Sequence, residues 1–271
     1  MHVDGLLEKE KSEVVMNNQI LKINKNQRDA YECVDLNNSN LLLKRYMHLL
    51  PLSTFNHKIT ILDVGGASGY FTKAVCDYLR NNNFEVTAYV LDTMRYSNWD
   101  NNFDDDIVFC EGSVEHVDTY WGGGKKFDLI FCNKVFHHFV TETYQGTINM
   151  IEACMNKLQR QLRKKGMLCI LDYFYNGLII DSFPSWMIYQ CTSQRNLVLM
   201  KLFKKMGAKS AGNGVCFQSE KMWCELIRRC QMEVKVMDKG PVFPMKVIKQ
   251  IFFLSHKPIE DCIFICEKKD F

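Results

Sequence analysis

A glycine-rich turn between an apolar run and a helical pattern constrains this chain more than any other feature. The stretch from Ile61 to Phe71 reads ILDVGGASGYF, so the apolar run reaches an acid, Asp63, and then a turn of small residues. Because glycine has no side chain and tolerates unusual dihedral angles, a ligand can approach the backbone of such a turn closely. The free N–H groups at the start of the following helix also point at that ligand. The acid disfavours a pyrophosphate there and favours a ligand with a cationic end.

Apolar segments and helical patterns alternate along most of the chain. Five apolar runs are predicted to be buried strands, at residues 59–64, 85–91, 107–110, 127–132 and 167–171. Strands that alternate with helices form a parallel, doubly wound sheet with right-handed crossovers. Two more strands, at residues 232–238 and 261–268, are joined without this alternation, which favours an antiparallel end. We therefore expect an α/β fold with a seven-stranded, mostly parallel, Rossmann-like sheet, an antiparallel last strand and a helical cap.

The segments outside this alternation indicate the domain organisation. Residues 1–50 predict an N-terminal helical cover, and residues 51–271 predict the main domain. A cap is predicted as an insertion at about residues 173–217, with a helix around residues 194–206. The insertion is rich in aromatic and Met side chains and follows the fifth strand, which favours a substrate lid over residues 174–189.

Two helix boundaries carry capping signals. An apolar stripe from Ile148 to Leu162 predicts a long helix before the fifth strand, and Gly166 is a favourable C-terminal cap for it. Ser219 is placed to cap the N-terminus of a later helix.

The composition is that of an ordinary globular protein and excludes several classes. The net charge of +3 is too small to indicate a nucleic-acid or membrane partner. No apolar stretch approaches the roughly 20 residues that span a bilayer, and the N-terminal sequence lacks the apolar core of a signal peptide. The twelve cysteines include no CxxC pair and no clustered His ligands, so we expect reduced thiols and no metal site. These observations predict a cytoplasmic protein.

Polar residues follow each of the five strands of the predicted parallel sheet. They are residues 63–69, Asp92, Ser113, residues 133–138 and residues 172–174. Ligands of such sheets bind at the carboxyl ends of the strands, near the point where the strand order reverses. The sequence therefore predicts a ligand site along this edge.

These motifs resemble the class I S-adenosylmethionine-dependent methyltransferases over roughly residues 59–172. The turn of that family runs acid-x-Gly-x-Gly-x-Gly, and here it runs DVGGASG from Asp63 to Gly69, with Ala67 replacing the middle glycine. The family's acid after the second strand binds ribose hydroxyls, and Asp92 stands at that place, about 23 residues beyond the turn. The segment FDLIFCNKVFHHF is similar to the form common in small-molecule branches of the family.

The resemblance implies S-adenosyl-L-methionine as the cofactor and assigns the residues that bind it. These are Asp63, Gly65, Gly66, Ala67, Gly69, Asp92, Thr93, Ser113, Val114 and Asn133. The family often carries an acid near the adenine amine after the third strand. Ser113 and Val114 stand there in this chain, which implies a weaker contact or one from the backbone. Carboxylates after the first and second strands suit a cationic sulfonium donor that also carries ribose hydroxyls.

Two adjacent histidines follow the fourth strand and are the candidate catalytic residues. Either His137 or His138 could remove the proton of a phenol, hydroxyl or amine at neutral pH. The alternative is that the pair packs beneath the cofactor and takes no part in the chemistry. Asp172, after the fifth strand, leaves a substrate role and a structural role open.

The predicted activity is methyl transfer to a small, partly apolar or aromatic acceptor. A hydroxyl oxygen is the favoured acceptor atom, with carbon or nitrogen close behind. An RNA or protein methyltransferase is the first alternative, and it predicts a basic surface around the cleft, against which the near-neutral charge speaks. A second alternative is a cofactor-binding regulator that does not turn over.

A dehydrogenase is disfavoured, and the oligomeric state stays open. The dinucleotide fingerprint needs Gly-x-Gly-x-x-Gly, whereas Gly65 and Gly66 are adjacent. We expect no nucleic-acid or membrane partner, and residues 243–253 are predicted to line the pocket or to form a homodimer face.

Overall fold

The computed structural model describes residues 38–96, 99, 105–121, 124–205, 208, 210–243, 247–255 and 259–269. The chain divides into two compact units, Met1–Val34 and Asp35–Phe271, and every described residue belongs to the second. The predicted N-terminal cover therefore lies largely outside the described residues.

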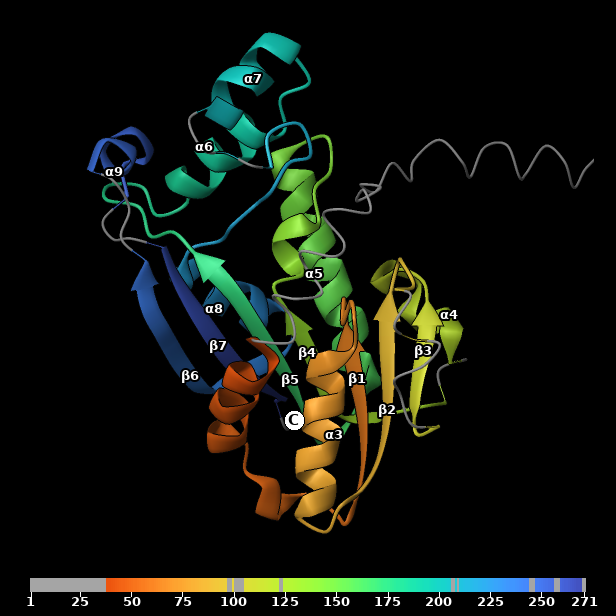
Figure 1. Ribbon diagram of the computed structural model, residues 1–271. Helices are drawn as coiled ribbons and strands as arrows, with labels where there is room; N and C mark the ends of the chain where they lie inside the picture. Colours follow the sequence, from red (N-terminus) through yellow and green to blue (C-terminus); the bar gives the residue numbers. More distant parts are fainter. Residues whose placement is uncertain are drawn as a thin grey trace, which may run out of the picture. The chain divides into compact units, whose positions relative to one another are not determined.

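Seven strands form one sheet in the order β3-β2-β1-β4-β5-β7-β6 (Figure 1). The strands are β1 (Lys58–Val64), β2 (Glu85–Asp92), β3 (Ile107–Glu111), β4 (Phe127–Asn133), β5 (Leu162–Phe174), β6 (Met232–Phe243) and β7 (Ile259–Lys268). β1 pairs in parallel with both β2 and β4, so the strand order reverses between β1 and β4. β7 is antiparallel to its neighbours β5 and β6. The predicted mostly parallel, seven-stranded sheet with an antiparallel last strand is confirmed.

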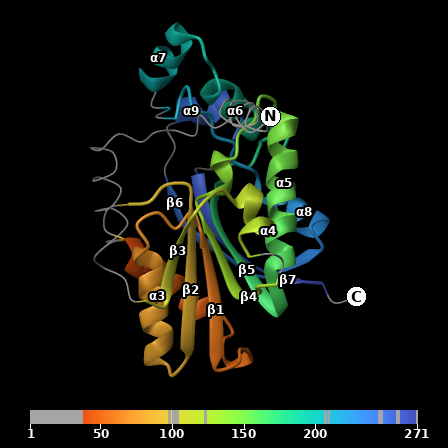
Figure 2. The same cartoon turned by 90° about the vertical axis from the view of Figure 1, so that its right-hand side faces the viewer.

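Helices cover both faces of the sheet. The labelled helices are α3 (Tyr70–Asn81), α4 (Val117–Tyr120), α5 (Tyr144–Gln161), α6 (Phe183–Thr192), α7 (Leu197–Lys205), α8 (Glu220–Arg229) and α9 (Val247–Phe253), with 3-10 turns η2 (Leu52–Thr54), η4 (Val114–His116) and η5 (Phe136–His138). A further helix spans residues 38–49. It packs with α3 on one face of the sheet, while α4, α5 and α8 lie on the other (Figures 1 and 2). This double cover explains why the central strands are almost continuously apolar.

The long helix α5 ends earlier than its sequence predicts. Thr143 caps its N-terminus, where Oγ1 accepts a hydrogen bond from the N–H of Gly146 at 3.0 Å. The helix ends at Gln161, and Leu162 already pairs with Phe127 as the first residue of β5. The prediction of a helix end at Gly166 was therefore wrong.

The physical reason is that the end of the apolar stripe belongs to the strand. Leu162 is buried in the sheet core, and Arg163 bonds across to Oδ2 of Asp128 at 2.7 Å. Lys165 adopts a φ of +67°, and a Cβ at Gly166 would lie 2.8 Å from the carbonyl oxygen of Phe127. The glycine thus serves a tight bend inside β5, not a helix terminus.

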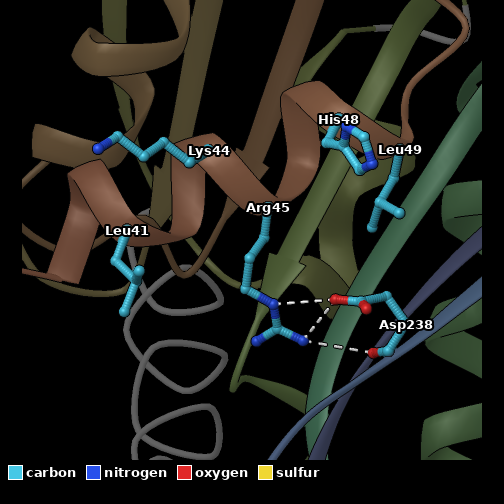
Figure 3. Close-up of a pocket in the computed structure, with 6 residues that line it drawn as sticks. All are labelled: Leu41, Lys44, Arg45, His48, Leu49 and Asp238. Carbon is cyan, nitrogen blue, oxygen red and sulfur yellow. Dashed lines mark hydrogen bonds and ion pairs between the residues drawn. The ribbon is translucent and has the colours of Figure 1, made fainter.

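The helix over residues 38–49 is bound to β6 and β7, the antiparallel end of the sheet, through Arg45. Nε and Nη2 of Arg45 donate to Oδ2 of Asp238 on β6 at 3.0 and 2.8 Å, as Figure 3 shows. Nη1 of Arg45 also lies 3.5 Å from Oδ1 of Asp261 on β7. Leu41 and Lys44 of the same helix are exposed beside a shallow hollow next to Asp238.

Three helices lie together beyond the carboxyl ends of the parallel strands. Figures 1 and 2 both place α6, α7 and α9 there, above the sheet. Their small core consists of buried Tyr175, Ile188 and Val215, with Phe217 and Phe253 packed against it. α7 falls within the helix predicted around residues 194–206, whereas α6 was not predicted as a helix. We call α6, α7, α9 and residues 178–180 the cap.

Candidate active site

The turn between β1 and α3 has a backbone that only small residues can adopt. Gly65 has a φ of +67° and Gly69 a φ of +78°, a region that glycine enters without steric penalty. A Cβ at Gly65 would lie 2.5 Å from Cγ2 of Val135. A Cβ at Gly66 would lie 2.7 Å from Oδ2 of Asp63. Neither glycine can therefore gain a side chain unless a neighbour moves.

Ala67 keeps a glycine-like conformation despite its side chain. Its φ is +46°, a left-handed conformation that costs a non-glycine residue about 1–2 kcal/mol. Two hydrogen bonds hold it there. Its N–H donates to Oδ2 of Asp92 at 2.9 Å, and its carbonyl accepts from Nε1 of Trp99 at 3.0 Å. Ala67 thus takes the left-handed conformation that a glycine would adopt at this place in the turn.

Asp63 and Asp92 place two carboxylates beside the turn. Asp63 is buried, and its Oδ2 accepts a hydrogen bond from Oγ1 of Thr72 at 2.6 Å. Asp92 is half-buried and accepts from the N–H groups of Ala67 and of Met94, the latter at 3.1 Å. Desolvation raises the pKa of Asp92, and these backbone hydrogen bonds oppose that shift by favouring the charged form.

The side chains of the segment after β3 are used within the fold, so they do not offer polar groups to a ligand. Oγ of Ser113 accepts a hydrogen bond from the N–H of Glu115 at 3.3 Å, and so caps η4. Val114 is buried in the core between the sheet and α5. Thr93, after β2, is exposed beside Asp92. A contact between a ligand and Ser113 or Val114 would therefore use the backbone.

Asn133, at the end of β4, is hydrogen-bonded to a side chain of the helix over residues 38–49. The hydroxyl of Tyr46 donates to Oδ1 of Asn133 at 2.7 Å. The Tyr46 ring is fully buried against Phe71 and Phe131, with centroids 5.6 and 5.0 Å away. Burial raises the pKa of Tyr46, so its hydroxyl remains a donor. This hydrogen bond fixes the amide orientation and leaves the Asn133 NH₂ group as a donor.

The two candidate histidines lie in η5 in different environments. His137 is buried, with 6% of its surface exposed, and its Nδ1 lies 2.7 Å from Oδ1 of Asp172. The backbone N–H of His137 also donates to Oδ2 of Asp172, at 3.2 Å. His138 is exposed, and partial desolvation, followed by repulsion from His137, lowers its pKa to about 4. The structure therefore gives one of the two histidines a carboxylate partner.

The Asp172 carboxylate determines which nitrogen of His137 is free. An ionised carboxylate can only accept hydrogen bonds, so Nδ1 of His137 must carry the hydrogen, and Nε2 is the free acceptor. Asp172 is 1% exposed and also accepts the N–H of Tyr173 at 2.8 Å. Three hydrogen bonds thus satisfy the buried carboxylate and fix the ring of His137.

Aromatic rings surround His137. The ring of Phe217, from the segment between α7 and α8, packs against it, tilted by 30° and with the centroids 4.8 Å apart. His138 covers another side, at 4.1 Å. Tyr173 and Tyr175 pack against Phe217 in turn, at 5.9 and 5.3 Å. The result is an apolar, aromatic surface beside the one histidine that has a free, oriented nitrogen.

A cation stands at the same edge of the sheet. Nζ of Lys134 lies 4.8 Å above the ring of Tyr173. Lys134 is half-buried and has a φ of +58°, unusual for a residue other than glycine. Such outliers cluster at functional sites.

Several of these residues were not singled out from the sequence. Tyr46 and Phe217 reach the site from elements that are distant in the chain, and nothing in their local pattern distinguishes them from core aromatics. Tyr173 lies in the predicted strand-end segment 172–174, but no role was assigned to it from the sequence. The left-handed Lys134 also carried no sequence signal, although its place after a strand end was noted. Among the described residues, no group of His, Cys, Asp or Glu side chains could hold a metal ion.

The strand registers bring the predicted residues to one edge of the sheet. Asp63 lies opposite Val90 on β2 and Phe131 on β4. Asp92 and Asn133 each come two residues after those partners, so both lie close to the end of β1. Asn133 pairs with Leu171, next to Asp172. The predicted turn, Asp92, Asn133, the two histidines and Asp172 therefore lie at the carboxyl ends of four adjacent strands, β2, β1, β4 and β5.

These residues fit a cofactor with ribose hydroxyls and a cationic end. The Asp92 carboxylate has about four lone-pair sites, and its bonds to backbone N–H groups leave capacity for a ligand hydroxyl. A Cβ at Gly66 would fill the space beside Asp63, which glycine keeps open. The buried negative charge of Asp63 suits a cationic group.

Several solved structures that share this fold are named as methyltransferases. The mitomycin 7-O-methyltransferase MmcR is 13% identical, with 89% of this chain and 56% of that chain covered at a TM-score of 0.51. The human N-acetylserotonin methyltransferase, solved with S-adenosylmethionine, is 12% identical, with 91% and 57% covered at 0.52. The Bacillus subtilis YcgJ protein is 12% identical, with 86% and 98% covered at 0.52.

The chain spans little more than half the length of the first two of these proteins, and such low identities show the fold alone. No curated protein sequence matches the chain significantly. The family evidence comes from the profile described as "Methyltransferase domain", which matches residues 55–227. That range runs from just before β1 into α8 and contains the turn, Asp92, Asn133 and the His137–Asp172 pair. The chain therefore belongs to the methyltransferase domain family, and S-adenosyl-L-methionine is its methyl donor.

Proposed function

We propose that this chain methylates a hydroxyl oxygen of a small, partly aromatic acceptor, with His137 as the general base. The observation that carries the proposal is the buried 2.7 Å contact between Nδ1 of His137 and Oδ1 of Asp172. It leaves Nε2 as an oriented acceptor on a ring that cannot turn, which is the arrangement that general-base catalysis requires.

The bound cofactor supplies an activated methyl electrophile, so the protein has two tasks, alignment and proton removal. Nε2 of His137 takes the proton of the acceptor hydroxyl as its oxygen becomes nucleophilic. Asp172 keeps the proton on Nδ1 and stabilises the positive charge that the imidazole gains. The tilted rings of Phe217 and His138 pack against the imidazole and limit its rotation.

The cofactor site in this proposal uses the residues assigned from the sequence. Asp92 accepts hydrogen bonds from the ribose hydroxyls. The turn residues Gly65, Gly66, Ala67 and Gly69 let the cofactor approach the backbone. Asp63 and Asn133 serve the methionine end, and Thr93, Ser113 and Val114 contribute through their backbone. The Asn133 amide is held by Tyr46 so that its NH₂ group donates.

The acceptor site in this proposal is the aromatic surface formed by Phe217, Tyr173 and Tyr175. Planar rings favour offset or edge contacts with such a surface. Lys134, above Tyr173, favours an acceptor whose oxygen carries negative charge, as a phenol does once it loses its proton. Two of the similar solved structures are named as methyltransferases of small molecules, which is consistent with this acceptor class.

A screen with methyl-labelled S-adenosylmethionine tests the proposal. The acceptors are phenols, quinols, primary amines and tRNA, and the protein is titrated with S-adenosylhomocysteine in parallel. We expect transfer to phenolic or quinol oxygen. Transfer to tRNA alone would identify an RNA methyltransferase, and tight cofactor binding without transfer to any acceptor would identify a regulator.

The Asp92→Ala variant controls for the cofactor site. We expect its affinity for S-adenosylhomocysteine to fall by about tenfold or more, because a hydrogen bond to a charged group contributes about 1.5–3 kcal/mol. An affinity equal to that of the wild type would remove Asp92 from the cofactor site.

A further inference from the structure

The cap exposes most of the large apolar side chains that reach the surface. Fourteen such side chains are exposed among the described residues, and ten of them belong to the cap. They are Leu178, Ile179, Ile180, Trp186, Leu197, Val198, Leu199, Leu202, Ile251 and Phe252. Exposed apolar residues scattered singly need no explanation, whereas a concentration of this kind marks an interaction surface.

Helix α7 is the clearest part of this surface. None of its nine residues is buried, and Leu197 and Val198 are 72% and 75% exposed. A helix this short gains most of its stability from the burial of an apolar face, because isolated helices of such length are marginal in water. We therefore expect the apolar side chains of α7 to be buried against a binding partner in the functional state of the protein.

Exposed basic side chains lie among these apolar ones, because Lys201, Lys204 and Lys205 of α7 are exposed. In the sequence, residues 182–219 contain Arg195 and four lysines and no Asp or Glu, and residues 244–258 contain three lysines and again no acid. The whole chain carries a net charge of only +3, so the remaining residues are net negative. On α7, the exposed Lys201 and Lys205 alternate with Val198 and Leu202 along one side of the helix. Such mixing of apolar and basic side chains is the pattern of helices that lie in the headgroup region of a membrane.

The neighbouring elements extend this surface. Ile179 is 82% exposed in the loop before α6, and Ile251 is 66% exposed on α9. The N–H of Leu178 donates to the carbonyl of Leu254 at 2.6 Å, which ties the loop to the end of α9. Figures 1 and 2 both show α6, α7 and α9 together, at the end of the molecule beyond the sheet.

We propose that the cap is a peripheral docking surface for a membrane with anionic lipids. Exposed leucine, isoleucine and tryptophan side chains insert among the acyl chains, and the lysines bind the anionic headgroups. No helix among the residues that the structure describes is long and apolar enough to cross a bilayer, so this contact lies at one leaflet. The proposal replaces the expectation of no membrane partner, which rested on the overall charge.

Two other occupants fit less well. A twofold dimer would bring the same patch of two copies together, and both would carry the same excess of positive charge. A nucleic acid would pair with the lysines and leave the leucine and isoleucine side chains in water. An anionic bilayer satisfies both components of the surface.

Flotation of the full chain with lipid vesicles tests the proposal. One set of vesicles is phosphatidylcholine alone, and the other is an equal mixture of phosphatidylcholine and phosphatidylserine. We expect binding to the mixed vesicles, weaker binding to phosphatidylcholine, and a loss of binding as salt screens the charges. The double variants Val198→Gln with Leu202→Gln and Lys201→Glu with Lys205→Glu should each lower the partition coefficient by roughly tenfold or more.

The matched control is Leu41→Gln with Lys44→Glu. These two residues are also exposed, one apolar and one basic, but they lie on the helix over residues 38–49. This variant should bind vesicles as the wild type does. Because none of the substituted residues belongs to the proposed active site, all variants should bind S-adenosylhomocysteine normally, which separates this test from that of the proposed function.

Four results would overturn the proposal. The first is absence of wild-type binding to the mixed vesicles. The second is equal loss in the cap variants and the control. The third is a concentration-dependent dimer in sedimentation velocity that the α7 variants abolish, which would make the cap a self-association surface. The fourth is binding of tRNA that the lysine variants abolish while their vesicle binding persists, which would assign the lysines to nucleic acid.

Discussion

The edge of the sheet and the cap above it are built by different physical rules. At the edge, each functional group is fixed by buried hydrogen bonds and close backbone packing, as in the pair of His137 and Asp172. In the cap, α6 packs on a small core of Ile188, Tyr175 and Val215, whereas α7 buries no side chain and exposes its apolar residues. The strand ends thus hold polar side chains in fixed positions, whereas the cap exposes apolar side chains to the surroundings. Substitutions should therefore affect chemistry at the edge, and acceptor or membrane contacts in the cap.

The largest effect is expected from Asp172→Asn. The amide can hold the ring in place, but its NH₂ group donates to Nδ1, so the ring hydrogen moves to Nε2 and the base is lost. We expect a fall in kcat of about 10²- to 10⁴-fold, with unchanged affinity for S-adenosylhomocysteine. Single-turnover kinetics with calorimetry measures both. A rate within twofold of wild type would make Asp172 a structural residue only.

The next effect tests the packing of the turn. Gly66→Ala would place a Cβ 2.7 Å from both Oδ2 of Asp63 and Cγ1 of Val90, so the turn must shift. We expect a loss in cofactor affinity of about tenfold to a hundredfold, and a stability loss of about 1–3 kcal/mol. Gly124→Ala is the matched control, because nothing lies within 4 Å of its Cβ position. Equal affinities in the two variants would contradict the close approach of the cofactor to the turn.

Phe217→Ala examines the place where the two regions meet. Phe217 packs against the cap core and also stacks on His137. We expect KM for the acceptor to rise by about tenfold, with the affinity for S-adenosylhomocysteine unchanged. Steady-state kinetics with a phenolic acceptor measures the first quantity. A change in cofactor affinity with an unaltered KM for the acceptor would show that Phe217 serves the cofactor site and not the acceptor site.

The smallest effect concerns His138 and pH. Its pKa of about 4 lies below the value of about 6.5 in an unfolded chain, so between these values the unfolded state binds more protons. The stability that neutral His138 contributes is complete above pH ~6.5 and is lost as the pH falls towards about 4. Urea unfolding of His138→Gln should show a weaker dependence on pH in that window and no difference above pH ~7. Because the side chain is exposed, we expect the effect to be modest, and parallel pH curves would contradict the lowered pKa.

The sheet could be predicted because each strand is marked by a pattern within its own short stretch of sequence. Each strand is an apolar run that ends in a polar residue, and the turn from Asp63 to Gly69 identifies the first strand and helix. The end of α5 was missed because Leu162 satisfies both the helical stripe and the strand that follows, and only the pairing with Phe127 decides between them. A sequence pattern cannot resolve a residue that suits two elements.

The site was predictable in its strand-end residues and not in its partners. Asp92 and His137 follow strands, where topology alone brings them together. That Asp172 selects His137 over His138 depends on the geometry of η5. Tyr46 and Phe217 come from elements whose packing no local pattern reveals. The cap surface was missed for another reason, since a net charge of +3 averages a basic, apolar cap with an acidic remainder.

The most direct test of the account is the single-turnover rate of methyl transfer in His137→Ala and His138→Ala, each saturated with S-adenosylmethionine and a phenolic acceptor. If His137 is the base, its removal slows transfer by about 10²- to 10⁴-fold, while removal of His138 has a much smaller effect. Affinity for S-adenosylhomocysteine should be equal in both variants. A His137→Ala enzyme that transfers methyl as fast as the wild type would contradict the account.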